Sequence, residues 1–147
     1  MCCKELKDSL GGDDACYSVS TVAKEKGRQL RLKLTPGKTA CKVQIDGCLI
    51  KDSGMVKCDF LFKICPDKRY YLVELKGTDV EHAVKQIENT FDIFNKRIKE
   101  KPQHFTGHII SSAVPRAELK FQNLKEKALK NKGLNIVKHS FAHEVTI

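Results

Sequence analysis

The chain has 147 residues, of which 41% are hydrophobic and 31% are charged. This length fits one domain with a single core, and the composition is that of a soluble globular protein. No apolar run approaches the roughly 18 residues of a membrane-spanning helix, and the polar start of the chain lacks the apolar segment of a secretory signal. The formal net charge of +9 favours a nucleic acid partner, although solubility alone would also account for it.

The chain contains seven cysteines, an odd number, and no secretory signal accompanies them. This combination predicts reduced thiols and a cytoplasmic protein. The four cysteines between residues 41 and 65 match no common zinc spacing. We therefore expect them to be small buried side chains rather than metal ligands.

The first third of the chain gives mixed signals. Residues 1–15 contain the breaker GGDD and are predicted to be poorly ordered, so that residues 16–147 form the single domain. Residues 17–34 suggest a helix followed by a strand, although Gly27 weakens a continuous helix. The turn TPGK comes next. Three β-rich runs then predict an antiparallel meander, over residues 41–50, 56–64 and 69–77.

The rest of the chain alternates between helices and strands. Residues 78–101 predict an amphipathic helix with Thr78 or Asp79 as its N-cap. A strand over residues 105–114, a basic helix over 116–132 and a final strand over 134–147 follow. The fold class is therefore α/β (α+β), with a mixed β-sheet flanked by helices.

Two acids of the meander are expected to face each other. A symmetric hairpin around residues 65–68 places Asp59 directly opposite Glu74, with Cβ atoms about 5 Å apart. Like charges in this position destabilise a sheet unless a cation lies between them. Magnesium binds one or two carboxylates together with water and phosphate oxygens. Because Lys76 follows on the same strand face, the three residues together suggest metal-dependent hydrolysis of a phosphodiester.

This pattern resembles the PD-(D/E)XK, or restriction-endonuclease-like, superfamily. An Asp on one strand is followed after a hairpin by Glu-x-Lys, here Cys58-Asp59 and then Glu74-Leu75-Lys76. The resemblance covers about residues 17–114, and the predicted element order fits the αβββαβ core of the superfamily. The Pro that often precedes the Asp is replaced by Cys58, at a position that varies within the superfamily.

The resemblance implies a magnesium- or manganese-dependent nuclease. Asp59, Glu74 and the backbone carbonyl of Leu75 would bind the metal, and Lys76 would assist the attacking water. DNA is favoured as substrate because most of the superfamily cuts DNA, and cutting both strands of a duplex would favour a homodimer. The alternatives are a non-catalytic nucleic-acid-binding module and a subunit of a larger defence or repair complex on the same fold.

Three further residues are candidates, and two of them, Gln86 and Asp46, have two interpretations each. Gln86 occupies a place where RecB-like members of the superfamily have a supporting Gln, but it also suits an ordinary helix surface. Asp46 is either a third acid or a residue leading into a glycine turn. Many members use a Glu from their first helix, and Glu25 is the best-placed residue for that role.

Charged residues near the C-terminus are also ambiguous. Lys120, Lys125 and Lys127 on the basic helix could bind phosphates or simply form a solvated face. His139 and His143 would share a face of the last strand, where a solvated edge is the default expectation.

Overall fold

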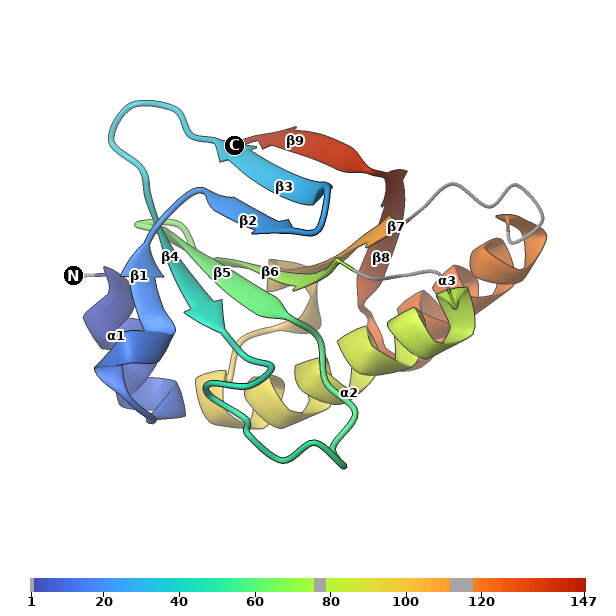
Figure 1. The fold of residues 1–147 in the computed structure, drawn as a ribbon, viewed down its shortest axis with the longest axis horizontal. Coiled ribbons are helices and arrows are strands. Elements are labelled where there is room, and N and C mark those ends of the chain that lie inside the picture. The colour runs from blue at the N-terminus through green and yellow to red at the C-terminus, as the bar shows by residue number, and fades with distance from the viewer. Residues whose placement is uncertain (1, 76–78, 112–117) are drawn as a thin grey trace.

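The computed structural model describes residues 2–75, 79–111 and 118–147 (Figure 1). The helices in these ranges are α1 (Cys2–Leu10), α2 (Val80–Ile98) and α3 (Glu118–Lys132). None of the described helices is long and apolar enough to cross a membrane. The larger sheet contains β1 (Tyr17–Val19), β4 (Thr39–Gln44), β5 (Phe60–Cys65), β6 (Arg69–Glu74), β7 (Phe105–Ser111) and β8 (Asn135–Ser140). The smaller sheet contains β2 (Val22–Glu25), β3 (Arg28–Lys33) and β9 (Ala142–Thr146).

The larger sheet is mixed, as the sequence predicts. Its order is β1-β4-β5-β6-β7-β8. Strands β4, β5 and β6 form the expected antiparallel meander, and residues 60–64 pair with residues 69–73 in the predicted register. Strands β7 and β8 continue the sheet in parallel with β6. The prediction of a mixed sheet accompanied by helices is thereby confirmed.

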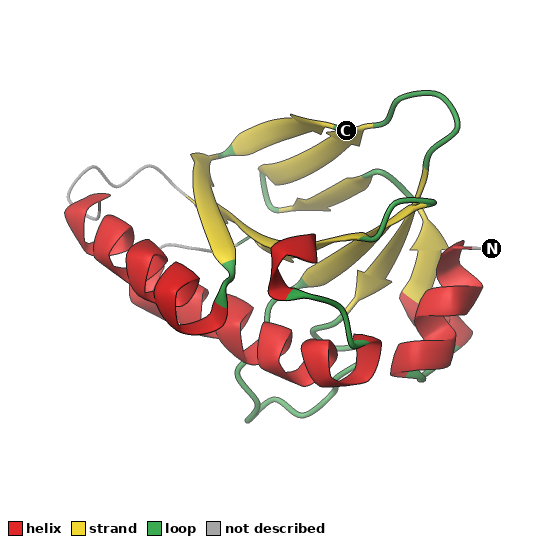
Figure 2. Cartoon of the chain, turned by 180° about the vertical axis from the view of Figure 1, so that it is seen from behind, coloured by secondary structure: helices red, strands yellow, loops and turns green. Residues whose placement is uncertain are grey.

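The molecule has three layers. Helices α1, α2 and α3 cover one face of the larger sheet, and the smaller sheet covers the other face (Figures 1 and 2). Leu72 of β6 faces the helices, whereas its neighbour Val73 faces the smaller sheet. Because β6 is buried on both faces, the polar residue at its end, Glu74, is also shielded from solvent.

Helix α2 begins where the sequence predicts. The side chain of Asp79 accepts a hydrogen bond from the backbone N–H of His82 at 3.1 Å, which makes it the N-cap. The helix lies close to β7, because a Cβ on Gly107 would come within 2.5 Å of Ile87 Cγ2. A glycine at this position therefore allows α2 to approach the sheet.

The N-terminal segment differs from the sequence prediction. Residues 2–10 form helix α1 rather than a poorly ordered stretch. Its side chains Leu6 and Leu10 are buried against the sheet, and the Glu5 carboxylate pairs with Lys63 Nζ at 3.0 Å. The breaker that follows ends the helix, but the buried leucines give this short segment the tertiary contacts that a helix of its length needs.

The predicted helix within residues 17–34 is also wrong, because this region forms strands. Strands β2 and β3 are joined by Lys26 and Gly27, whose φ angles of 45° and 80° are those of a tight hairpin turn. Gly27, expected to weaken a helix, instead allows this turn. Glu25 therefore lies at the end of a strand and not on a first helix.

The C-terminal region contributes to both sheets. The single strand predicted over residues 134–147 is divided at Phe141, which has a φ of 58°. Strand β8 ends the larger sheet, and β9 pairs in parallel with β3 in the smaller one. Gly133, with a φ of 70°, follows the end of α3 as the sequence predicts.

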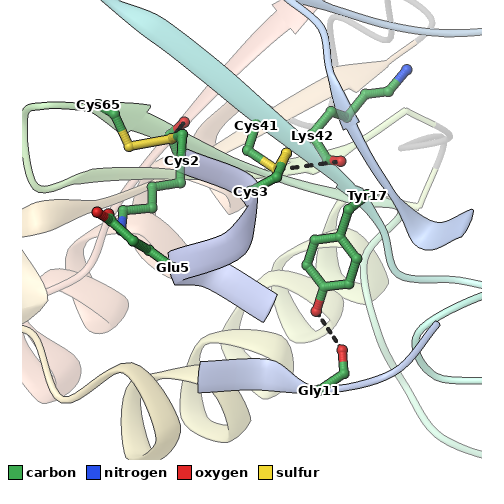
Figure 3. The surroundings of a disulfide bond; sticks show 9 residues. Cys2, Cys3, Glu5, Gly11, Tyr17, Cys41, Lys42 and Cys65 are labelled. Atoms are coloured by element: carbon green, nitrogen blue, oxygen red, sulfur yellow. Dashed lines mark hydrogen bonds and ion pairs between the residues drawn. A yellow bond between two sulfur atoms is a disulfide. The ribbon is translucent and has the colours of Figure 1, made fainter. Parts of the chain in front are cut away.

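Six of the seven cysteines form disulfides, which corrects the prediction of reduced thiols. The pairs are Cys2–Cys65, Cys3–Cys41 and Cys16–Cys48. Figure 3 shows the first two pairs, which attach the start of α1 to β4 and β5. Cys58 is a buried free thiol. Because disulfides persist mainly in oxidising environments, the cysteines no longer support the prediction of a cytoplasmic location.

Candidate active site

Asp59 lies immediately before β5 and next to the end of β6. Its backbone N–H donates to the carbonyl of Val73 at 3.0 Å, and Phe60 is paired with that same residue. Two residues of one strand thus oppose a single residue of the other, as in a β-bulge. The predicted register holds for residues 60–64 but shifts at Asp59, so the expectation of Asp59 directly opposite Glu74 is wrong.

The shift gives the Asp59 side chain a backbone partner. Its Oδ2 accepts a hydrogen bond from the N–H of Leu75 at 2.9 Å. Asp59 is 8% exposed and Glu74 is 2% exposed. Burial, and then the negative charges of Glu74 and Asp59, raise the pKa of the Cys58 thiol. The carboxyl groups of Asp59 and Glu74 therefore both lie close enough to Cys58 to affect its thiol. Lys76, the third residue of the motif, lies outside the described residues.

Helix α2 holds the segment that leads into Asp59. Gln86 Nε2 donates to the carbonyl of Lys57 at 3.0 Å. Thr90 Oγ1 accepts a hydrogen bond from the N–H of Cys58 at 2.9 Å and donates to the carbonyl of Gln86 at 2.7 Å. Gln86 is thus part of the site's framework. Thr90 was missed by the sequence interpretation, although its place one helical turn after Gln86 on the same face was a usable signal.

The two additional acids share a cavity with Asp59. This cavity has a volume of about 210 Å³ and is lined by Lys24, Glu25, Gln44, Asp46, Asp59 and Phe60. Asp46 comes from the turn after β4, and Glu25 comes from β2. The structure therefore gathers all three acids, but it supplies Glu25 from the smaller sheet and not from a helix.

A second cavity, of about 360 Å³, lies on the other side of Asp46. His82, Gln86 and the loop over residues 53–57 also line it. Within it, Lys57 is 6% exposed, and its ammonium group donates to the carbonyls of Asp52 and Met55 at 2.7 and 3.1 Å. Lys57 Nζ also lies 3.5 Å from Asp46 Oδ1. Sequence reasoning gave no role to this lysine, two positions before Asp59.

The three candidate lysines of α3 differ in their contacts and in their exposure to solvent. Lys120 pairs with Glu81 at 2.8 Å, at the N-terminal ends of α3 and α2. Lys125 donates to Asn135 Oδ1 and to the carbonyl of Ile136 at 2.9 and 2.6 Å, and burial lowers its pKa. Lys127 lines a surface hollow together with other polar residues of α3. Lys125 therefore serves the fold, whereas Lys120 and Lys127 keep most of their exposure.

A cluster of histidines lies apart from these acids. The rings of His139 and His143 stack at 3.4 Å between centroids, and the His108 ring lies 5.7 Å from His139. His108 is buried, and burial lowers its pKa to about 3. His139 and His143 lie on two different edge strands, β8 and β9, and both are half-buried, so the edge position agrees with the expectation. The expectation that they share a face of one strand is wrong, because the chain changes sheet at Phe141. Within the described residues, no three His, Cys, Asp or Glu side chains are arranged to hold a metal ion together.

The comparisons with known proteins give no match. No family model matches the chain, and neither the curated proteins nor the solved structures show significant similarity to it. The function has to be inferred from the residues and their geometry.

Proposed function

We propose that the protein is a metal-dependent nuclease that hydrolyses phosphodiester bonds, with DNA as its substrate, on a PD-(D/E)XK-like core. The observation that carries the proposal is the hydrogen bond from Leu75 N–H to Asp59, because it ties one carboxylate to the residue directly after the other, Glu74. The order of β4 to β7 with α2 between β6 and β7 supports the same proposal. So does the net charge of +9, which suits a polyanionic substrate.

The residues fit a hard divalent cation. Asp59 and Glu74 are nearly buried carboxylates that come from neighbouring strand ends, and carboxylate oxygens are the ligands that such a cation prefers. Asp59, Glu74 and the carbonyl of Leu75 would hold magnesium or manganese, which accept such oxygen ligands with water completing the shell. When bound, the ion supplies Lewis acidity and lowers the pKa of a coordinated water.

The chain's own residues keep the site in place. The Leu75 amide fixes the orientation of the Asp59 carboxylate, while Gln86 and Thr90 fix the backbone at Lys57 and Cys58. Such prior positioning reduces the reorganisation needed during reaction. We assign to Lys76 the role of orienting the attacking water. The cavity that Asp46 shares with Asp59 would admit the phosphate.

A cleavage assay tests the proposal. Supercoiled plasmid, linear duplex, single-stranded DNA and RNA would each be offered with magnesium, manganese or EDTA. The wild type would be compared with Glu74→Ala, Lys76→Ala and the control Glu126→Ala, which alters an exposed acid of α3. The proposal expects metal-dependent DNA cleavage that Glu126→Ala retains and the other two variants lose.

The assay also separates the alternative functions. No cleavage with any metal, together with salt-sensitive DNA binding that Glu74→Ala and Lys76→Ala both retain, would contradict the nuclease and identify a binding module. Cleavage that appears only after a stable partner is added would identify a subunit of a larger complex.

A further inference from the structure

A polar cavity lies at the other end of β6 from Glu74. Its volume is about 510 Å³, larger than either cavity beside Asp46. Because Glu74 comes five positions after Arg69 on the strand, the two ends are roughly 17 Å apart. The walls come from the β5–β6 turn, from β6 and from the segment leading into β7, and they include Lys68, Arg69, Tyr71, Gln103, His104 and Thr106.

The acids of this region already have cationic partners. Asp67 Oδ2 pairs with Lys38 Nζ at 2.9 Å. Glu100, just outside the cavity, lies 3.7 Å from Lys68 Nζ and 2.9 Å from His104 Nδ1. Lys38, and then the more distant charge of Arg69, lower the pKa of Asp67. Because Asp67 is already paired with Lys38 and Glu100 with Lys68, Arg69 leaves the region with an excess positive charge.

Several hydrogen-bonding groups of the walls have no protein partner. The side chains of Arg69, Tyr71, Gln103 and Thr106 make no hydrogen bond or ion pair with another described residue. The Tyr71 ring is held in place, because the residue is only 8% exposed and the ring centroid lies 5.3 Å from that of His108. Arg69 and Gln103 are exposed and Thr106 is half-buried, so these donors face the cavity and are open to a ligand.

We propose that this cavity binds a phosphate monoester of nucleotide size. A guanidinium group recognises phosphate through paired N–H donors, and the Tyr71 and Thr106 hydroxyls with the Gln103 amide can donate to the remaining oxygens. The cavity volume falls within the range of small-molecule sites and exceeds the need of phosphate alone. Two sources supply such a phosphate, a free mononucleotide and the 5′ end of a nucleic acid strand, and the experiment below distinguishes them. The site does not depend on the proposed nuclease activity.

Isothermal titration in EDTA tests the site. The probes are a nucleoside 5′-monophosphate, the matching nucleoside, inorganic phosphate, and an oligonucleotide with and without a 5′-phosphate. The proposal expects the monophosphate to bind and the nucleoside not to bind, with at least a tenfold loss of affinity in Arg69→Gln. The matched control Arg31→Gln, on the exposed side of β3, should bind as the wild type does. Preference for the phosphorylated oligonucleotide over the mononucleotide would identify a strand end as the source of the phosphate.

Two results would overturn the proposal. One is equal affinity of Arg69→Gln and wild type for the monophosphate, or no binding by either protein at millimolar ligand. The other is binding that Asp59→Asn abolishes and Arg69→Gln leaves intact, since the ligand would then occupy the region of the candidate active site. Failure of DNA cleavage would not affect either readout, so the two proposals are tested separately.

Discussion

The Asp59 carboxylate accepts a hydrogen bond from the backbone N–H of Leu75 at 2.9 Å. A side chain from just before β5 is thereby fixed to the residue that follows Glu74, at the end of β6. The local bulge at Asp59 and Phe60 makes this contact possible, because it takes Asp59 out of the regular strand pairing.

Asp59→Asn should remove the negative charge of this residue and keep its hydrogen bond to the N–H of Leu75. The amide oxygen of Asn can still accept from Leu75, so the thermal midpoint should stay near that of the wild type. Metal-dependent cleavage should fall by about a hundredfold or more, as is typical when a group that stabilises transition-state charge is removed. Plasmid cleavage and thermal unfolding measure the two effects. Wild-type cleavage by Asp59→Asn would remove this residue from the proposed metal site.

Thr90→Val should destabilise the fold by about 1–3 kcal/mol, because the N–H of Cys58 would lose its acceptor in a buried place. Thr90→Ser keeps the hydroxyl and serves as the matched control, with a smaller effect expected. Urea unfolding of both variants gives the difference. If the Val variant is as stable as the wild type, α2 does not hold this segment through Thr90.

Acid should destabilise the fold through the buried His108 and the half-buried His139. His108 has a pKa of about 3 in the folded protein and an ordinary value of 6.5, and His139 has a pKa of about 4. The unfolded chain therefore binds more protons below pH 6.5, so the free energy of unfolding should decrease as the pH falls from 6.5 towards 3. The effect of His108, which is 4% exposed, is of the order of a few kcal/mol, and solvent screening makes the contribution of the half-buried His139 smaller.

His108→Phe isolates one part of this acid sensitivity. The slope of unfolding free energy against pH between 4 and 6 should fall by about half, because His139 still titrates. His82→Gln, which alters an exposed histidine of α2, should leave the slope unchanged. Urea titrations at a series of pH values provide the measurement, and an unchanged slope in His108→Phe would count against a neutral buried imidazole.

The thiol count distinguishes the two interpretations of the cysteines. Unreduced protein, denatured and treated with a thiol reagent, should show one reactive thiol per chain, from Cys58. Reduction should raise the count to seven and lower the stability, by about 2–5 kcal/mol for the loss of a single disulfide. Seven thiols before reduction would instead support the reduced, cytoplasmic protein that the sequence suggested.

The sequence predicted elements whose signals are local. The cap at Asp79 and the register of residues 60–64 depend on neighbouring residues and on one short turn, and both are confirmed. The bulge at Asp59 has no local sequence signal, and the α2 contacts that hold the preceding residues, Lys57 and Cys58, come from 29 and 32 positions away. The positive φ of Phe141 is also unusual for an aromatic residue and carries no sequence signal.

Other differences arise from contacts distant in sequence. Gly27 could have indicated a hairpin, since the residues after it alternate between polar and apolar, but the long mixed run concealed this pattern. Cysteine spacing does not reveal which thiols meet in space. The acids of the site were found because their chemistry is distinctive, whereas Lys57 and Thr90 were missed because their importance comes only from their partners.

The parallel pairing of β9 with β3 has a consequence for folding kinetics. Residues 29–33 must be joined by residues 142–146, from the opposite end of the chain, before the core between the two sheets is closed. Contacts between such distant segments carry a loop-closure cost that is recovered only late in folding. We therefore expect the smaller sheet to form after the β4–β6 meander, and to be the slow phase observed when the chain refolds with its disulfides intact.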